Sequence, residues 1–423
     1  MNPLVAALIA GGVLAFGLLS RRFEGSVLTP PLAFVALGMA LAPDGLGLLD
    51  VEVGEGLAHL LAEFTLVLVL FGDAARIDVR ALRRELGLPV RLLALGLPLT
   101  FLAGFGLAVW LLPELGLAHA ALLAAILSPT DAALGQAVVS DSRVPLRVRQ
   151  ALNVESGLND GLALPAVLIL AALAGAGPDS GRSGVEWLGF AALQVTVGPT
   201  AGLAVGWLGA RAVHGAAARG WVSEPFEQLS GLALALLAFA GAELAGGNGF
   251  IAAFTAGLTF GTVARGFCEG LYRFVEAEGQ LLVLLVFLLL GCALAWPALR
   301  EASAASWLYA LGSLTLVRML PVAIALVGSG LQPVSLLFLG WFGPRGLASL
   351  LFALLVAGPQ VMPAGTPIFS TVILTVLLSV LLHSVSAAPV ARRYGAHLLA
   401  RREQAAHEHA AVTAHPLRVR RHS

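Results

Sequence analysis

The sequence predicts an all-α polytopic membrane protein with about thirteen transmembrane helices, and its composition supplies the first two reasons. Of its 423 residues, 58% are hydrophobic and only 12% are charged, with a mean hydropathy of +0.89. Soluble domains carry about 25% charged residues, so this composition excludes an ordinary soluble domain. A spanning helix takes about 20 apolar residues, so thirteen spans need about 260 positions, which is close to the apolar content. The third reason is the distribution of arginine.

Thirteen apolar runs follow one another along the chain, separated by polar or charged segments. In hydrocarbon no water satisfies the backbone groups, so segments this apolar span a membrane only as helices. The runs at 27–42 and 249–264 are short for a complete span. The runs cover residues 3–20, 27–42, 57–74, 87–112, 115–139, 150–174, 187–210, 227–245, 249–264, 279–298, 304–327, 331–357 and 366–390.

The first run is predicted to be a spanning helix and not a secretion signal. No basic residue precedes it, whereas Arg21 and Arg22 follow it. A cleavable signal carries its positive charge before the apolar stretch and a small-residue cleavage site behind it. The reversed charge predicts that the N-terminus lies outside the cell.

The arginine distribution tests this count of spans. With the N-terminus outside, the inner loops and the C-terminal tail hold twenty arginines, whereas the outer loops hold only Arg182 and Arg300. Cytoplasmic loops carry the excess of positive charge in membrane proteins. Removing or adding one early span would invert the alternation and destroy this bias. We therefore expect thirteen helices in the inner cell membrane, with a cytoplasmic C-terminus.

Polar motifs inside the spans indicate where function lies, because an ionisable group in hydrocarbon is costly. A single motif is equally explained by a charge at a loop end, but the cluster in the fifth and sixth spans is not. The motifs are Asp73 at the end of the third span, Ser-Pro-Thr-Asp at 128–131, Asn-Val-Glu-Ser-Gly-Leu-Asn-Asp-Gly at 153–161, Arg318 in the eleventh span and Gly-Pro-Arg-Gly at 343–346.

The spacing within the sixth span assigns its side chains to two faces. Ser156 and Asp160 are four residues apart and share one face, which we expect to meet a ligand. Glu155 and Asn159 share the adjacent face, which we expect to meet a neighbouring helix. A charged Glu155 in a low dielectric needs a cation nearby. One of the two arginines of the eleventh and twelfth spans is the candidate partner, and the alternative is a protonated, neutral Glu155.

The fifth and twelfth spans are both predicted to be broken. Pro129 removes a backbone donor and clashes with the preceding turn, and Pro344 stands between two glycines. The two spans are seven helices apart, so they run in opposite directions. This predicts an inverted repeat of spans one to six and eight to thirteen with two crossing broken helices, as in transporters. Asp131 is expected to offset a positive helix N-terminus and Arg345 a negative C-terminal end. The alternative is a pair of unrelated kinks.

Taken together, these motifs resemble the NhaP-type sodium/proton antiporters of the cation:proton antiporter superfamily, over the whole chain except its tail. The resemblance implies a homodimer in which each protomer has a dimerisation domain and a six-helix core. The transporter domain would be residues 1–391. Its core would be about 87–174 and 304–391, and the dimerisation and linker helices about 1–86 and 187–298. Residues 392–423 would form a cytoplasmic tail rich in Arg and His.

The resemblance also implies roles for individual residues. Asp160 would be the essential carboxylate that binds the ion and the proton. Asp131, Ser156 and the backbone carbonyl of Thr130 would complete an alkali-cation site. Asp73 would take the place of a glutamate that reaches the ion through water. A structural network would comprise Glu155, Arg318, Asn159 and Arg345.

The implied function is exchange of Na⁺ or Li⁺ for H⁺ by alternating access, in the service of pH homeostasis. Both ions compete for Asp160, because either one neutralises the same carboxylate. In electrogenic relatives a second aspartate takes the position of Asn159, and a core lysine commonly accompanies it. Asn159 does not titrate and the chain contains no lysine, which favours an electroneutral one-for-one cycle.

Other functions were weighed against this interpretation. A K⁺/H⁺ antiporter or a cation channel of the same fold would carry the same motifs. An intramembrane aspartyl enzyme using Asp131 and Asp160 would explain neither the broken helices nor the buried arginines. Nucleic-acid binding has no basic domain to rest on. We expect no cofactor, and only membrane lipid and a second copy as partners. His383 in the last span is interpreted as a hydrogen-bonded core residue.

Overall fold

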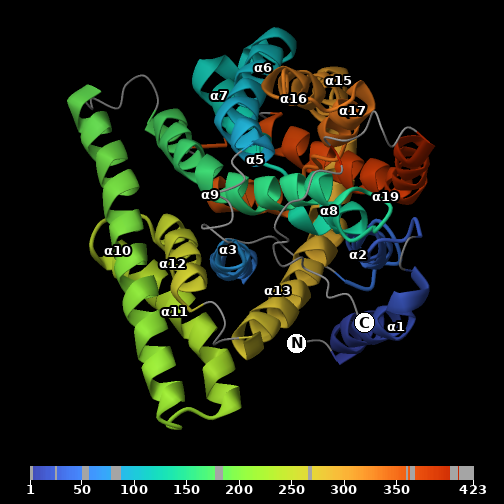
Figure 1. Ribbon diagram of the computed structural model, residues 1–423. Helices are drawn as coiled ribbons and strands as arrows, with labels where there is room; N and C mark the ends of the chain where they lie inside the picture. Colours follow the sequence, from blue (N-terminus) through green and yellow to red (C-terminus); the bar gives the residue numbers. More distant parts are fainter. Residues whose placement is uncertain are drawn as a thin grey trace.

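The computed structural model is built of helices, and no strand occurs among the residues that it describes (Figure 1). Those residues are 3–23, 26–49, 57–77, 87–176, 184–264, 269–358, 361–362, 367–400 and 408. The all-α prediction is therefore confirmed over this part of the chain.

Each of the apolar runs coincides with a helix or with an interrupted helix. The continuous helices are α1 (Pro3–Phe23), α2 (Pro30–Leu41), α3 (Leu57–Ala75), α9 (Leu146–Ala176), α10 (Gly184–Ala218), α11 (Glu224–Leu244), α12 (Gly249–Val263) and α19 (Ile368–Ala400). The interrupted ones pair α5 (Leu88–Arg91) with α6 (Leu97–Leu111), α7 (Gly116–Ile126) with α8 (Ala132–Val139), α13 (Glu269–Leu289) with α14 (Ala295–Glu301), α15 (Ala304–Leu314) with α16 (Leu316–Ala325), and α17 (Pro333–Trp341) with α18 (Leu347–Val356).

Two of the interruptions are short π-helical segments that the sequence reading did not anticipate. They cover Leu92–Gly96 and Leu290–Leu294. A proline follows two or three residues after each segment, in the first turn of the next helix: Pro98 or Pro297. A proline ring clashes with the carbonyl four residues earlier, and in both cases that carbonyl belongs to the π segment. The wider turn accommodates the ring while the helix continues.

Part of the described chain is long and apolar enough to cross a membrane. By length and composition the qualifying segments within it are Leu88–Leu111, Leu146–Gly175, Gly279–Glu301, Ala304–Ala325 and Ile368–Ala400. Shorter apolar helices cover Pro30–Leu41, Pro113–Ile126, Gln228–Leu244, Gly249–Val263 and Leu347–Val356. The number of thirteen spans stays a prediction.

The helices form two groups (Figure 1). In the lower part of the view α10, α11 and α12 pack on one another, α12 packs on α3, and α13 packs on α2 and α3. In the upper part α7 and α8 pack on α9, α15 packs on α19, and α16 packs on α6. The broken helix α7–α8 and the first half of the other broken helix, α17, belong to the upper group, whereas its second half, α18, packs on α3 as well as on α19 and α9.

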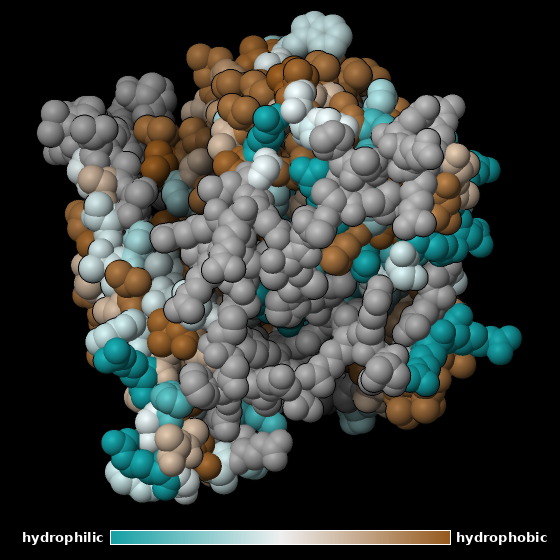
Figure 2. All heavy atoms as spheres, in the orientation of Figure 1, coloured by the Kyte–Doolittle hydropathy of each residue, from teal (hydrophilic) through white to brown (hydrophobic). Residues whose placement is uncertain are grey.

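Hydrophobic side chains are exposed on the outside of the upper group. Figure 2 shows them over the region of α6, α15 and α16. They include Trp110 and Leu316, whose exposed fractions are 76% and 74%. Exposed apolar surface of this extent suits contact with lipid acyl chains.

The last helix extends beyond its predicted end at residue 390. Helix α19 continues to Ala400, because Tyr394 and Leu398 still pack into the interior while Arg392 and Arg393 point to solvent. The predicted tail boundary at 392 therefore falls inside a helix. Beyond Ala400 the structure describes only Glu408, so most of the predicted Arg/His-rich tail lies outside the described residues.

Helix α12 lies against α3 with almost no space between their backbones. A Cβ atom on Gly257 would overlap the carbonyl oxygen of Phe71, and one on Gly261 would overlap that of Ala75. These two glycines thereby fix the position of α3, which carries Asp73.

We expect Gly261→Ala to destabilise the protein by about 1–3 kcal/mol, because the two helices must move apart to admit the methyl group. The midpoint of thermal unfolding in detergent measures this change. Gly106→Ala on α6 is the matched control, since a Cβ there has no atom within 4 Å. Equal unfolding midpoints for the two variants would contradict the close packing.

Candidate functional site

The two central breaks lie directly against each other. Helix α7 ends at Ile126 and α8 begins at Ala132, while α17 ends at Trp341 and α18 begins at Leu347. The backbone N–H of Asp131 donates to the carbonyl oxygen of Pro344 at 2.8 Å. The non-helical segments 127–131 and 342–346 are therefore joined through their backbones at the centre of the upper group.

The Asp131 carboxylate satisfies the N-termini of two helices. Its Oδ1 accepts from the N–H groups of Ala133 and Leu134 at 2.6 and 3.1 Å, and this caps α8. Its Oδ2 accepts from the N–H of Leu347, the first residue of α18. A Cβ atom on Gly346 would overlap this carboxylate, so only glycine fits beside it. Asp131 thus compensates the positive ends of both helices.

Arg345 bonds backbone carbonyls just beyond the C-terminal end of α7. The side chain is completely buried, and its Nη1 donates to the carbonyl oxygens of Ser128 and Pro129 at 2.7 and 3.0 Å. The hydroxyl of Ser349 on α18 donates to the carbonyl of Ile126 at 2.8 Å. The carbonyls that the broken helix leaves unpaired are thereby bonded without water.

Glu155 pairs with Arg318. The two guanidinium nitrogens Nη1 and Nη2 donate to the two carboxylate oxygens at 2.6 and 2.8 Å. The exposed fractions of the side chains are 1% for Arg318 and 2% for Glu155. Of the two candidate arginines, Arg318 is therefore the one that faces Glu155. This ion pair links α9 to α16. A Cβ atom on Gly343 would overlap the Arg318 guanidinium, so the pair also packs against the break between α17 and α18.

Three hydroxyl and amide side chains join the α7–α8 break to α9. Thr130 Oγ1 lies 2.9 Å from Ser156 Oγ, and Asn159 Nδ2 donates to Thr130 Oγ1 at 2.7 Å. Asp160 lies one turn beyond Ser156 on the same face of α9 and is 7% exposed. The structure therefore brings together Thr130, Ser156, Asn159 and Asp160, and places Asp131 on the same short break.

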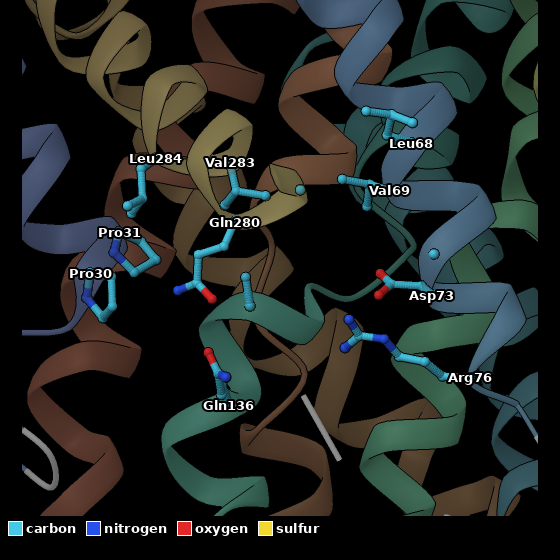
Figure 3. A pocket seen from close by; sticks show the side chains of 13 residues that line it. Pro30, Pro31, Leu68, Val69, Asp73, Arg76, Gln136, Gln280, Val283 and Leu284 are labelled. Atoms are coloured by element: carbon cyan, nitrogen blue, oxygen red, sulfur yellow. The ribbon is translucent and has the colours of Figure 1, made fainter. Parts of the chain in front are cut away.

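Asp73 lines a cavity next to the start of α8. The cavity has a volume of about 40 Å³ and is lined by α2, α3, α8 and α13. In Figure 3, Asp73 and Arg76 point into it from one side and Gln136 and Gln280 from the other. Its wall includes Ala133, two residues after Asp131.

Three further residues complete the crossing. The sequence predicts only His383 among them, as a hydrogen-bonded core residue, and this prediction is confirmed. Ser349 bonds the end of α7, and Ser379 Oγ accepts from the backbone N–H of Arg345 at 2.8 Å. His383 bonds the carbonyl of Trp341 at the end of α17. A serine or histidine in an apolar run is an ordinary observation, but Ser379 and His383 are four residues apart and face the predicted break. That spacing is the only signal that the sequence offers.

The charges at the crossing do not cancel. Three buried carboxylates, those of Asp131, Glu155 and Asp160, stand with two buried guanidinium groups, those of Arg318 and Arg345. With all five groups ionised the sum is minus one. Buried uncompensated charge is costly, so the site favours one bound positive charge. The surrounding donors are carboxylate, hydroxyl and carbonyl oxygens, which are ligands for hard cations and acceptors for protons.

A comparison with protein families matches nearly the whole chain. The family model described as "Sodium/hydrogen exchanger, transmembrane" matches residues 5–393. Among solved structures, the sodium proton antiporter MjNhaP1 from Methanocaldococcus jannaschii at pH 8 is similar, with a TM-score of 0.73 and 23% identity. The match covers 92% of this chain and 97% of that one. The likeness shows that the two share a fold.

The curated relatives are matched over only part of their own length. The K(+)/H(+) antiporter NhaP2 of Shewanella sp. strain MR-4 is 25% identical over 351 residues, which cover 83% of this chain and 59% of that protein. The uncharacterized Na(+)/H(+) exchanger YjcE of Escherichia coli K12 is 32% identical over 236 residues, which cover 54% of this chain and 41% of that protein. The chain thus spans about 59% of the length of the first of these relatives.

We expect Glu155→Gln to cost about 3–5 kcal/mol of stability, because it leaves the buried Arg318 without its carboxylate. Thermal or denaturant unfolding of the purified protein measures the loss. Asp44→Asn is the matched control. It removes the carboxylate partner of Arg300, whose side chain is 65% exposed, and such exposed pairs contribute under about 1 kcal/mol. Similar losses in both variants would show that the buried pair has no special role.

Proposed function

The chain belongs to the sodium/hydrogen exchanger family, and on this premise we propose that it is a secondary antiporter that exchanges a monovalent cation for protons. The family is one of transporters rather than enzymes. The exchanged ions are its substrates, and it uses no cofactor. Membership of this family argues against an intramembrane aspartyl hydrolase.

The charge sum at the crossing is the observation that carries this proposal. When all five buried groups are ionised their net charge is minus one, and one proton or one alkali cation then brings the site to zero. The two ions therefore compete for the same deficit. A protein segment that crosses hydrocarbon only when neutral must carry one of them on each passage, which couples their movements in opposite directions.

Asp160 is proposed as the carboxylate that binds the ion. Ser156 lies one turn away on the same helix face, and its hydroxyl is 2.9 Å from that of Thr130. Carboxylate and hydroxyl oxygens with the nearby backbone carbonyl of Thr130 form a donor set that suits a hard cation. Asn159 holds Thr130 through its amide and belongs to the structural network with Glu155 and Arg318.

Asp131 is proposed to hold two helix ends in place as well as to lie near the ion. Its two oxygens accept from three backbone N–H groups that belong to two helices. An acid proton on either oxygen would compete with these donors, so this carboxylate serves best as a fixed negative charge. Asp160 is then the group that exchanges its proton. Asp73, in the cavity between α3 and α8, is proposed to guide the ion towards the site.

The upper helix group is proposed as the moving core and the lower group as the dimerisation domain of a homodimer. This division corresponds to about 87–174 and 304–391 for the core. Thirteen spans, an inverted repeat, an outside N-terminus and an inner-membrane location belong to the same proposal. They are supported by the apolar runs and by the arginine distribution.

Sodium is the first candidate for the exchanged cation, because the oxygen donors suit it and the description of the family names sodium. Lithium has the same charge and is a second substrate to test. Potassium is the alternative, since the Shewanella relative is named as a K(+)/H(+) antiporter. The cycle is proposed to be electroneutral, because Asn159 does not titrate and no lysine is present to carry a second proton.

Asp160→Asn is expected to abolish cation-dependent proton flux, because a neutral amide does not take up and release a proton and provides no negative charge for the cation to neutralise. Quenching of a pH-sensitive dye in inverted vesicles, with Na⁺, Li⁺ or K⁺ added in turn, measures the flux and identifies the ion. Asp141→Asn is the control, and it is expected to retain the flux. Asp141 lies in the loop before α9, where burial raises its pKa but hydrogen bonds from Arg143 lower it further, below its ordinary value. Flux retained by Asp160→Asn would refute the proposed site.

Electroneutral exchange predicts a rate that does not respond to membrane voltage. A potassium gradient with valinomycin imposes the voltage during the Na⁺ assay, and the initial rate of dye recovery is compared with and without it. A rate that rises and falls with the imposed voltage would show that unequal charges are exchanged.

A further inference from the structure

His383 lies deep in α19 and connects it to the break between α17 and α18. The side chain is 1% exposed. Its Nε2 lies 2.8 Å from the carbonyl oxygen of Trp341, the last residue of α17. Its Nδ1 lies 2.9 Å from the carbonyl oxygen of Ser379 and 3.2 Å from the Ser379 hydroxyl. In the tautomer with its proton on Nε2, the ring donates to the Trp341 carbonyl and Nδ1 accepts from the Ser379 hydroxyl. This tautomer leaves the Ser379 oxygen as the acceptor for the Arg345 N–H.

The bond to Trp341 completes a set of four. Two broken helices have four inner ends, and each leaves backbone groups unpaired. Asp131 bonds the N-termini of α8 and α18, and Arg345 with Ser349 bonds the C-terminal end of α7. The remaining end is the C-terminus of α17. His383 supplies a side-chain donor there, from a neighbouring helix and in an apolar setting.

A second contact links His383 to the proposed ion site. The Ser379 hydroxyl oxygen accepts from the backbone N–H of Arg345 at 2.8 Å and lies beside His383 Nδ1. Arg345 in turn donates to the carbonyls of Ser128 and Pro129. Those residues directly precede Thr130. One continuous path of hydrogen bonds therefore runs from His383 through Arg345 to the backbone beside the site.

We infer that His383 is a positioning residue for ion exchange. It holds the C-terminal end of α17, and with Ser379 it fixes the backbone from which the Arg345 guanidinium reaches the α7–α8 break. Loss of this donor releases the 342–346 segment and with it the carbonyls that flank Thr130. The inference rests on the proposed function, because its readout is the apparent affinity for the exchanged cation.

A purely packing role makes the opposite prediction for matched variants. The His383 ring is stacked on Trp341 with a centroid distance of 5.1 Å and an interplanar angle of 24°. His383→Phe keeps an aromatic ring on Trp341 and removes the donor. His383→Gln removes the ring and keeps an amide N–H near the position of Nε2. A role in hydrogen bonding is preserved by Gln, whereas a role in stacking is preserved by Phe.

The test is cation-dependent proton flux in inverted vesicles containing equal amounts of each folded variant. We expect His383→Phe to raise the KM for the cation about tenfold, the change that one lost buried hydrogen bond produces. His383→Gln is expected to stay within about twofold of the wild-type KM, with similar kcat in both variants. Any result in which Gln does not perform better than Phe overturns the inference.

Ser379→Ala provides an independent second variant, because it removes the hydroxyl between His383 and Arg345 and changes little volume. Its KM is expected to rise, and the double variant with His383→Phe is expected to show less than the sum of the two effects. If neither His383 variant folds, an unchanged KM in Ser379→Ala overturns the inference. A wild-type protein with no cation-dependent flux would overturn the proposed function and this inference together. An active wild type with unaffected variants would overturn this inference alone.

Discussion

The fold depends on one constraint, which is that backbone groups freed by a helix break must be bonded inside the membrane. Two such breaks meet at the centre of this protein, and together they expose four helix ends. Asp131, Arg345, Ser349 and His383 bond these ends from neighbouring elements. Arg345, Ser349 and His383 each bond a helix end that lies far from them in the sequence, and Asp131 joins two helix ends. The crossing is therefore stable only when the surrounding helices are assembled.

This arrangement makes a polar site possible where hydrocarbon would otherwise exclude one. The breaks bring backbone carbonyls and the hydroxyl of Thr130 next to α9, and the Glu155–Arg318 pair holds α9 in place. Replacing a buried ion pair with apolar residues is often neutral for stability. The value of this pair is better explained by position, since it fixes α9 relative to α16 and to Gly343. Asp160 lies one turn beyond Ser156 on the same face of α9.

Much of this was predictable from the sequence, for reasons that can be named. Pro129 and Pro344 each stand among polar residues or glycines in the middle of an apolar run, so both breaks were located within a few residues. Proline alone is not sufficient, since Pro165 and Pro389 lie inside continuous helices. The apolar runs located the helices, because hydrocarbon permits no other structure. By contrast, Glu155 and Arg318 are 163 residues apart, and their pairing depends on packing that no local pattern encodes. The break at Thr315 and the π segments likewise lack a signal strong enough to read, and His383 was interpreted as a core residue because a single histidine carries no directional information.

If a proton and a cation compete for one carboxylate, the affinity for the cation must change with pH, and this dependence is measurable on the purified protein. The cation raises the unfolding temperature of purified protein by binding the folded state, and the concentration dependence gives an apparent dissociation constant at each pH. Competition for one site predicts that this constant increases about tenfold for each unit that the pH falls in the acid range, and becomes constant in the alkaline range. A dissociation constant that is the same at every pH would contradict the account.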